Sequence, residues 1–126
     1  MAIPMKREII AIDGNNRVAM PINRDEIWMT EMELAELFGV LVPTIRAAIS
    51  ALYKSGIVRE SETTQCIRLP SGNYADTYNL ETILALAFWL NSSYAAIVRR
   101  WLLQKAIVRT QVVLPIVVLT TLNSGY

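Results

Sequence analysis

The fold of this chain rests on residues 30–54, which read TEMELAELFGVLVPTIRAAISALYK. Thr30 and Glu33 have the spacing of a capping box, in which each side chain bonds the other residue's backbone amide at a helix start. Gly39 has the position of a left-handed residue that ends this helix. Pro43 suits the first position of a second helix, because its missing N–H would have no partner there anyway. The stretch predicts two helices joined by a short turn.

A helix-turn-helix is indicated by the spacing of Ala35, Gly39 and Ile45. Ala35 would lie where the helices cross, Gly39 would make the turn, and Ile45 would fill the angle between the helices. Two helices joined by a short turn that contains Gly define this motif. The alternative is an αα-hairpin that binds no ligand. We favour the helix-turn-helix, because a pair of strands suited to form a wing follows the second helix.

Apolar residues recur at helical spacing on both helices. On the first helix we expect Met32, Leu34, Ala35 and Phe38 to be buried. On the second, the amphipathic stripe consists of Ile45, Ala48, Ile49, Leu52 and Tyr53, and Ser55-Gly56 ends the helix.

A β-hairpin is predicted before the helix pair. Residues 8–12 and 17–20 have strand-like composition and flank a turn at residues 13–16. The Asp13-Gly14 pair is a strong hairpin signal, because Gly accepts a positive φ at no steric cost.

Strands and two further helices are predicted after the helix pair. Residues 63–69 and 74–78 read as strands joined by a turn at 70–73. Asn79 is expected to cap a third helix at 80–90, which is apolar nearly all round and therefore central to the core. A fourth helix runs from 94 to about 109, with a core stripe of Ile97, Trp101, Leu102 and Ala106. We also expect Trp28, Met29 and Trp89 in the core.

The predicted fold is α+β and mostly helical. Residues 1–110 are expected to form a winged helix-turn-helix domain with an N-terminal β-hairpin and C-terminal helices. Residues 111–126 form an apolar tail that lies outside this pattern. The tail is compatible with an edge strand, a strand at a dimer interface, or part of a helix that Pro115 interrupts.

The composition is that of a single globular domain with a sizeable core. The chain has 126 residues, of which 53% are hydrophobic, and a mean hydropathy of +0.34. Its 12 basic and 11 acidic residues leave a net charge of only +1, so any basic face must be local. The longest apolar runs, 83–90 and 112–119, are shorter than the roughly 20 residues of a membrane-spanning helix. We expect no membrane contact.

Catalytic and metal-binding constellations are missing from the sequence. It contains no histidine, which removes Ser-His and Cys-His dyads and every His-ligated metal site. Its single cysteine, Cys66, has no partner for an intrachain disulfide, which favours a reducing compartment. No Gly-rich phosphate loop is present. We therefore expect a cytoplasmic protein that is not an enzyme and uses no cofactor, metal ion or small-molecule substrate.

Several short motifs within about residues 9–109 are specific only in combination. They are Ile27-Trp28-Met29-Thr30, Glu36-Leu37-Phe38-Gly39-Val40, Val42-Pro43-Thr44-Ile45, Ser55-Gly56, Tyr78-Asn79-Leu80 and Asn91-Ser92. Together they make the chain resemble the RhuM-type virulence-associated proteins of bacteria, which are related in style to phage antirepressor-like and Fic-associated N-terminal domains. The resemblance implies a DNA-binding N-terminal domain. Members of this family are longer, so we expect either a fragment or a short member whose tail replaces the rest.

The second helix departs from that family at two points. Leu41 stands where relatives usually have a Ser, which removes a capping hydroxyl and a donor to phosphate. The exposed face is rich in alanine and keeps only Arg46, Ser50 and Lys54 as polar readers. Both departures weaken the prediction of sequence-specific DNA recognition.

DNA contacts are predicted on the second helix and the wing. Arg46 is the strongest candidate, because a bidentate Arg is the commonest reader of guanine, although a solvated surface Arg is equally compatible with the sequence. The full set of predicted DNA-binding residues is Thr30, Pro43, Thr44, Arg46, Ala47, Ser50, Lys54, Arg59, Arg68 and Asn73. A second basic face on the fourth helix, made of Arg99, Arg100, Lys105 and Arg109, is either a phosphate-facing patch or a solvated helix face.

Two functions follow from these patterns. In the first, the protein is a transcriptional or phage- or virulence-associated regulator that binds duplex DNA as a homodimer, through helix 43–54 and wing 63–78. In the second, it is a protein-interaction module that keeps the fold without reading DNA. Its alanine-rich face around Ala47 and Ala51 would then pack on a partner, and the apolar tail would drive assembly.

Overall fold

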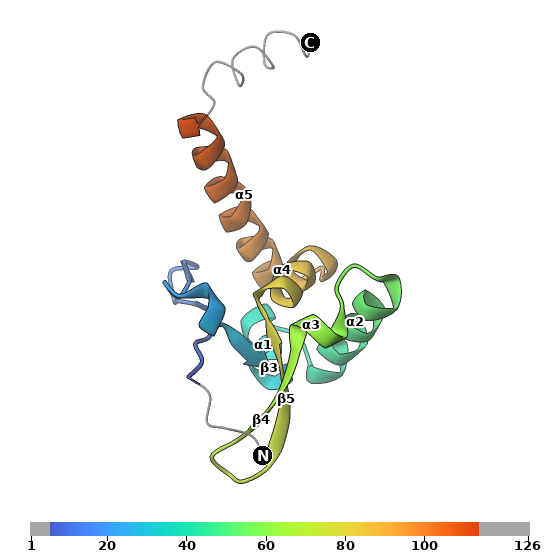
Figure 1. The fold of residues 1–126 in the computed structure, drawn as a ribbon. Helices are drawn as coiled ribbons and strands as arrows, with labels where there is room; N and C mark the ends of the chain where they lie inside the picture. The colour runs from blue at the N-terminus through green and yellow to red at the C-terminus, as the bar shows by residue number, and fades with distance from the viewer. Residues whose placement is uncertain (1–5, 114–126) are drawn as a thin grey trace.

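The computed structural model describes residues 6–113, and the side chains of residues 6–106. The tail interpretation falls largely on residues 114–126, which lie outside the described part of the chain. Along the chain the elements are β1 (Ala11–Ile12), β2 (Val18–Ala19), the 3-10 helix η1 (Arg24–Glu26), β3 (Trp28–Thr30), α1 (Glu31–Phe38), α2 (Val42–Ser55), α3 (Glu60–Thr63), β4 (Thr64–Arg68), β5 (Tyr74–Asn79), α4 (Leu80–Trp89) and α5 (Ser93–Val113) (Figure 1). This is an α+β fold, as predicted.

The N-terminal hairpin is present, but its strands are shorter than the predicted 8–12 and 17–20, and a different residue closes its turn. β1 and β2 are antiparallel and pair Ala11 with Ala19. The positive φ expected at Gly14 is instead found at Asn16, at 60°. The Asp13 carboxylate accepts hydrogen bonds from the backbone amides of Asn15 and Arg17, at 2.8 and 2.9 Å, and these bonds lower the pKa of Asp13. The aspartate therefore organises this turn.

The helix pair forms as predicted, with its start and its turn in the expected places. Glu33 Oε1 accepts the Thr30 amide at 2.9 Å, and Thr30 Oγ1 accepts the Glu33 amide at 3.2 Å, which completes the capping box. Gly39 ends α1 in the left-handed conformation, with φ 64°. The chain bends by 104° between α1 and α2. α2 begins at Val42, so Pro43 is its second residue and not its first.

A second sharp corner lies against the end of α1. The chain bends by 116° between α4 and α5. At this corner the Ser92 hydroxyl donates to the Phe38 carbonyl at 2.7 Å and accepts the Ala95 amide at 3.1 Å. The Tyr94 ring packs over Gly39, where a Cβ would lie 2.7 Å from Tyr94 Cδ2. The two corners are thus held together by one hydroxyl and one ring.

The sheet joins segments from both sides of the helix pair. Its order is β3-β5-β4, and both pairings are antiparallel. β4 and β5 form the predicted hairpin, whose turn has Gly72 at φ 94°. The strand predicted at 63–69 was wrong at both ends, since β4 stops before Leu69 and begins after Thr63. Thr63 ends α3, and its buried hydroxyl donates to the Arg59 carbonyl at 2.7 Å. β3 was not predicted, and its pairing with β5 places the start of α1 beside the end of the hairpin.

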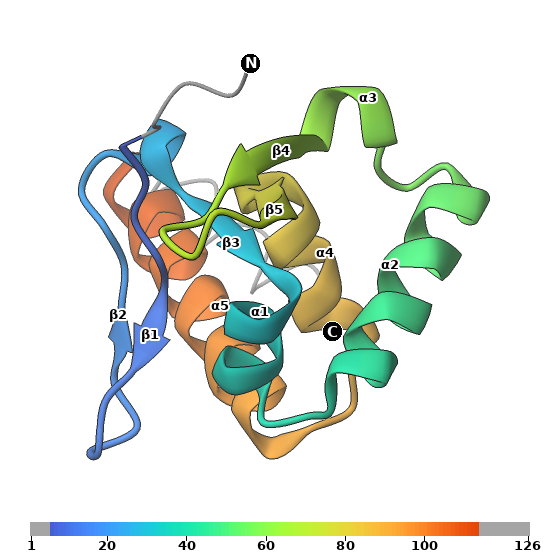
Figure 2. The ribbon, with the colours of Figure 1, turned by 90° about the horizontal axis from the view of Figure 1, so that it is seen from below.

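The core lies between the helix pair and α4, with α5 across one side (Figure 2). Its fully buried side chains include Leu34, Phe38, Ile45, Ile83 and Leu86. The stripe predicted on α2 is buried at Ile45, Ala48, Ile49 and Leu52, and Tyr53 is partly buried. Asn79 caps α4 as expected, since its side chain accepts the Thr82 amide.

Two side chains that were predicted in the core, those of Met32 and Trp89, are exposed. Met32 is 74% exposed, whereas Leu37, which was not predicted, is buried. Met32 precedes Leu34 by two residues, about 200° around a helix, so both cannot face one core. Trp89 is 48% exposed because it lies at the edge of the buried face of α4, about 100° around the helix from the centre of that face. Trp28 is only partly buried, and Met29 is buried as predicted.

The stripe predicted on α5 is displaced around the helix. The buried residues are Ala95 and Val98. Ile97 and Trp101 are partly buried, on a face turned away from Ala95. Ala106 is on the same face as Ala95 but is exposed, because α5 extends beyond the body of the protein at that point (Figure 1).

We expect Gly39→Ala to destabilise the fold more than Gly56→Ala. Both glycines are left-handed, with φ 64° and 78°, so an alanine at either position should cost about 1–2 kcal/mol. At Gly39 the added methyl also meets the Tyr94 ring, which should cost about 1–3 kcal/mol more. A Cβ at Gly56 meets nothing within 4 Å. Urea unfolding of both variants measures the difference, and equal losses would show that the Tyr94 contact does not constrain the turn.

Candidate nucleic-acid interface

The residues predicted to contact DNA on α2 share one exposed face. Because Ile45, Ala48, Ile49 and Leu52 are buried, the opposite side of the helix faces solvent. The exposed side chains there include all six predicted residues of this helix: Pro43, Thr44, Arg46, Ala47, Ser50 and Lys54. Its N-terminus has no side-chain cap, as expected from Leu41.

Arg46 is paired with a carboxylate of the first helix. Its Nη2 lies 3.1 Å from Glu31 Oε1, and its Nε donates to the same oxygen at 3.3 Å. The hydrogen bonds to Glu31 raise the pKa of Arg46. Glu31 is the first residue of α1, and its side chain reaches across to α2. The strongest candidate reader is therefore exposed but already bound to an acid.

The remaining predicted residues lie on the β4–β5 hairpin, at the start of α3 and in the core. Arg68 on β4 and Asn73 in the hairpin turn are exposed. Arg59 precedes α3 and lies 3.7 Å from Glu62 in an exposed ion pair. Thr30 is only 9% exposed, and its hydroxyl is used by the capping box. The structure does not bring Thr30 to the surface that carries Arg46.

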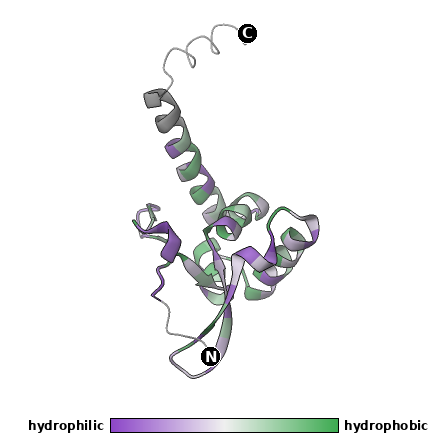
Figure 3. Ribbon diagram, in the orientation of Figure 1, coloured by the Kyte–Doolittle hydropathy of each residue, from purple (hydrophilic) through white to green (hydrophobic). Residues whose placement is uncertain are grey.

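Acidic side chains lie between α2 and the β4–β5 hairpin. Tyr78 on β5 is nearly buried, and burial, reinforced by the Glu31 and Asp76 carboxylates, raises its pKa. The short helix α3, which contains Glu60 and Glu62, is hydrophilic and lies beside the same region (Figure 3). This side of the protein thus mixes both charges and is not continuously basic. The mixing was not predicted, because it depends on which strands pair with β3.

An apolar groove borders the N-terminal half of α2. A cavity of about 520 Å³ is lined by Pro43, Thr44, Ala47, Ala48, Trp89, Leu90 and Asn91. The exposed indole of Trp89 forms its wall on α4, opposite the small side chain of Ala47. This groove was missed because Trp89 was assigned to the core.

The basic face predicted on α5 is smaller than expected. Arg99 turns inward, and its Nη1 donates to the carbonyls of Ala87 and Leu90 at 2.7 and 2.9 Å. It therefore satisfies backbone groups at the end of α4, where helices leave carbonyls unpaired. Arg100 and Lys105 are exposed, and the Lys105 ammonium lies 5.7 Å from the centre of the Trp101 ring. The Arg109 side chain lies outside the described part.

Two features are absent from the described residues. No group of three or more His, Cys, Asp or Glu side chains there is arranged to hold a metal ion. No single helix in this part of the chain is long and apolar enough to cross a membrane.

Comparison with protein families, curated proteins and solved structures finds no match to this chain. The resemblance to RhuM-type proteins therefore stays a prediction.

An ion pair that sequence reasoning missed supports the start of α1. Arg7 Nη1 donates to Glu33 Oε1 at 2.6 Å and to the Trp28 carbonyl at 3.0 Å. Burial opposes ionisation of Glu33, but the bonds from Arg7 and the Thr30 amide outweigh it, so the pKa of Glu33 is lowered. Arg7 thereby ties the N-terminal segment to the first residues of the candidate interface.

This ion pair predicts a loss of stability in acid. Because the pKa of Glu33 is lower in the folded state than its ordinary value of 4.5, the stabilisation is fully present above that value. It is lost as the pH falls further, through the folded-state pKa. We expect Glu33→Gln to lower the free energy of unfolding at pH 7 by about 1–3 kcal/mol, and by less at pH 3.

Urea unfolding between pH 7 and pH 3 measures this difference. Glu36→Gln is the matched control, because Glu36 is exposed on the same helix and makes no ion pair with any described residue. A Glu33→Gln variant that loses equal stability at both pH values would show that the ion pair does not stabilise the fold.

Proposed function

We propose that this protein binds duplex DNA through the exposed face of α2, as a winged helix-turn-helix in which the β4–β5 hairpin is the wing. The observation that carries this proposal is the 104° bend between α1 and α2, with the polar residues of α2 on the outer side. Helix-turn-helix pairs meet at about 90–120°, which leaves the second helix free to enter the major groove. The three-stranded sheet that flanks the pair also supports it.

The side chains on α2 suit phosphate contacts better than extensive base reading. Thr44, Ser50 and Lys54 are donors that can bond phosphate oxygens, and such contacts position a protein without reading sequence. Ala47 is small enough to let the helix backbone approach the bases. Arg46 is the one exposed guanidinium on the helix, and it suits guanine. We therefore propose binding with modest sequence preference, by a homodimer on paired half-sites, in the cytoplasm.

The Glu31–Arg46 ion pair weakens the proposed DNA binding. Arg46 must exchange the Glu31 carboxylate for a phosphate or a base, and Glu31 then stays close to the DNA backbone. Both effects weaken binding, and the second is repulsion between like charges. Glu31 thus acts against the proposed function and restricts binding to sites that offer Arg46 a better partner.

A second candidate function is protein binding at the groove between α2 and α4. The exposed Trp89 beside Ala47 favours it, because exposed aromatic side chains are enriched at protein interfaces. A partner in this groove would cover the N-terminal half of α2 and exclude DNA from it. The two functions are therefore alternatives at one surface.

The first test compares three arginine or lysine variants in DNA binding. Arg46→Gln and Lys54→Gln should each weaken binding to a duplex at low salt by about five- to tenfold and reduce the salt slope by about 1. Arg24→Gln removes the same charge from η1, so it should leave binding unchanged. Fluorescence anisotropy over a salt series measures these effects.

Two results would reject DNA binding. Wild-type protein that does not bind duplex DNA at low salt, or α2 variants that bind as the wild type does, would reject the DNA function. Light scattering of Ala47→Glu then examines the second candidate. Loss of an oligomer that the wild type forms would support docking of a second copy in the groove, and an unchanged mass would reject that docking.

The second test examines the Glu31–Arg46 exchange. We expect Glu31→Gln to tighten DNA binding by about three- to tenfold, because it frees Arg46 and removes a negative charge near the backbone. In the Arg46→Gln background the gain should be smaller, since only the repulsion remains. Anisotropy titrations of the two single variants and the double variant measure the coupling. Weaker binding by Glu31→Gln would show that Glu31 positions Arg46 for DNA and does not oppose binding.

A further inference from the structure

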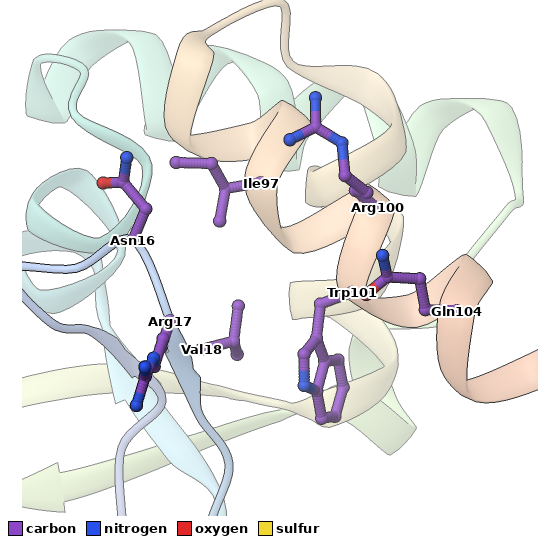
Figure 4. A pocket seen from close by; sticks show the side chains of 7 residues that line it. All are labelled: Asn16, Arg17, Val18, Ile97, Arg100, Trp101 and Gln104. Carbon is purple, nitrogen blue, oxygen red and sulfur yellow. The ribbon is translucent and has the colours of Figure 1, made fainter.

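A cavity lies between the N-terminal hairpin and α5. The two ribbon views place this hairpin on the side of the protein away from α2 (Figures 1 and 2). The cavity has a volume of about 420 Å³. Val18, Ile97 and Trp101 form its apolar surface, and polar side chains of the hairpin and α5 form its rim. Figure 4 shows Arg17 on the hairpin side and Arg100 on the helix side of this space.

The cavity exists because the hairpin only partly covers one face of α5. Ile97 and Trp101 are partly buried at the edge of the core face that holds Val98, and Val18 of β2 lines the cavity together with them. β1 and β2 are two residues long each, so the hairpin is too short to bury the whole indole. Half-buried apolar surface is thereby left beside charged groups.

The charge around the cavity is positive. Glu81 is the last acidic residue of the chain, so α5 contains no carboxylate at all. Arg17 and Arg100 are exposed, and neither makes an ion pair with another residue of the described part. Lys105 adds a third cation beside Trp101. Asp13 in the hairpin turn accepts the backbone amides of Asn15 and Arg17, and its carboxylate also interacts with the charge of Arg17.

We propose that this cavity binds a small organic anion with a flat apolar body, such as an aromatic carboxylate. Its volume is near the lower end of the roughly 300–1,000 Å³ of ligand pockets, which suits one ring or a fused pair of rings. The ring would stack on Trp101, and a guanidinium of Arg17 or Arg100 would pair with the carboxylate in the bidentate manner that arginine favours. The amides of Asn16 and Gln104, also on the rim, would bond further polar atoms.

This site is independent of the proposed DNA contact. Both ribbon views place the hairpin and α2 on opposite sides of the body, so DNA held by α2 does not extend over the cavity (Figures 1 and 2). The same two arginines would otherwise suit DNA phosphates. The experiment therefore separates a free organic anion from a second DNA contact.

The test uses indole-3-acetate as the probe and indole-3-acetamide as its neutral counterpart. We expect the acid to shift the indole N–H signal of Trp101 in a heteronuclear NMR titration of the full chain, and the amide to bind at least about fivefold more weakly. The Trp101→Phe variant identifies the signal. The Trp28 indole, which donates to the Asp25 carbonyl at 3.2 Å, is the internal control that should not move.

Charge-removing variants then identify which arginine binds the carboxylate. Arg17→Gln and Arg100→Gln should each weaken binding of the acid about three- to tenfold without changing thermal stability, because both side chains are exposed. Arg24→Gln is the control and should bind as the wild type does. Equal binding of acid and amide, an unmoved Trp101 signal, or equal loss in Arg24→Gln would overturn the proposal. Loss of DNA affinity in the Arg17 and Arg100 variants, without loss of the acid, would assign these arginines to DNA.

Discussion

The structure depends on the close approach of two chain corners at Gly39. The left-handed glycine ends α1, and the Tyr94 ring occupies the space that a side chain at this position would need. Ser92 reaches across the same point to the Phe38 carbonyl and also caps α5. The bend between α1 and α2 and the bend between α4 and α5 are therefore coupled. Buried residues of α1, α2, α4 and α5 form one core between these two bends. The direction of α2 therefore depends on the turn at Gly39 and on the Tyr94 ring that packs over it.

The exposed face of α2 is shaped both by the fold and by an ion pair with α1. The fold leaves this face exposed, but it also places Glu31 at hydrogen-bonding distance from Arg46. An exposed ion pair of this kind contributes little to stability, because water screens it and both side chains lose freedom. Its larger effect is on charge, since it neutralises the one guanidinium of the helix. In the proposed function, the pair thus affects DNA binding by α2 more than it affects the stability of the fold.

Two neighbouring arginines on α5 have different surroundings. Arg99 and Arg100 are adjacent, so their side chains leave the helix about 100° apart. Arg99 reaches the open carbonyls at the end of α4, whereas Arg100 faces the cavity beside the hairpin. Arg99 therefore completes the corner between α4 and α5, whereas Arg100 is exposed and makes no ion pair with another described residue.

Local rules in the chain were sufficient to predict the helix pair, both hairpins and the caps of α1 and α4. Thr30, Glu33, Gly39 and Asn79 act through backbone groups within a few residues, so their roles can be deduced from the sequence. The faces of the helices were less predictable, as Met32, Trp89 and Ala106 show, because hydrophobicity alone does not tell which side another element covers. The pairing of Glu31 with Arg46, the inward turn of Arg99 and the cavity at Trp101 join residues distant in sequence or on different elements. The first two exist because the helix corners bring α1 against α2 and α5 against the end of α4, and the cavity exists because the N-terminal hairpin only partly covers α5. No local pattern in the chain specifies these contacts.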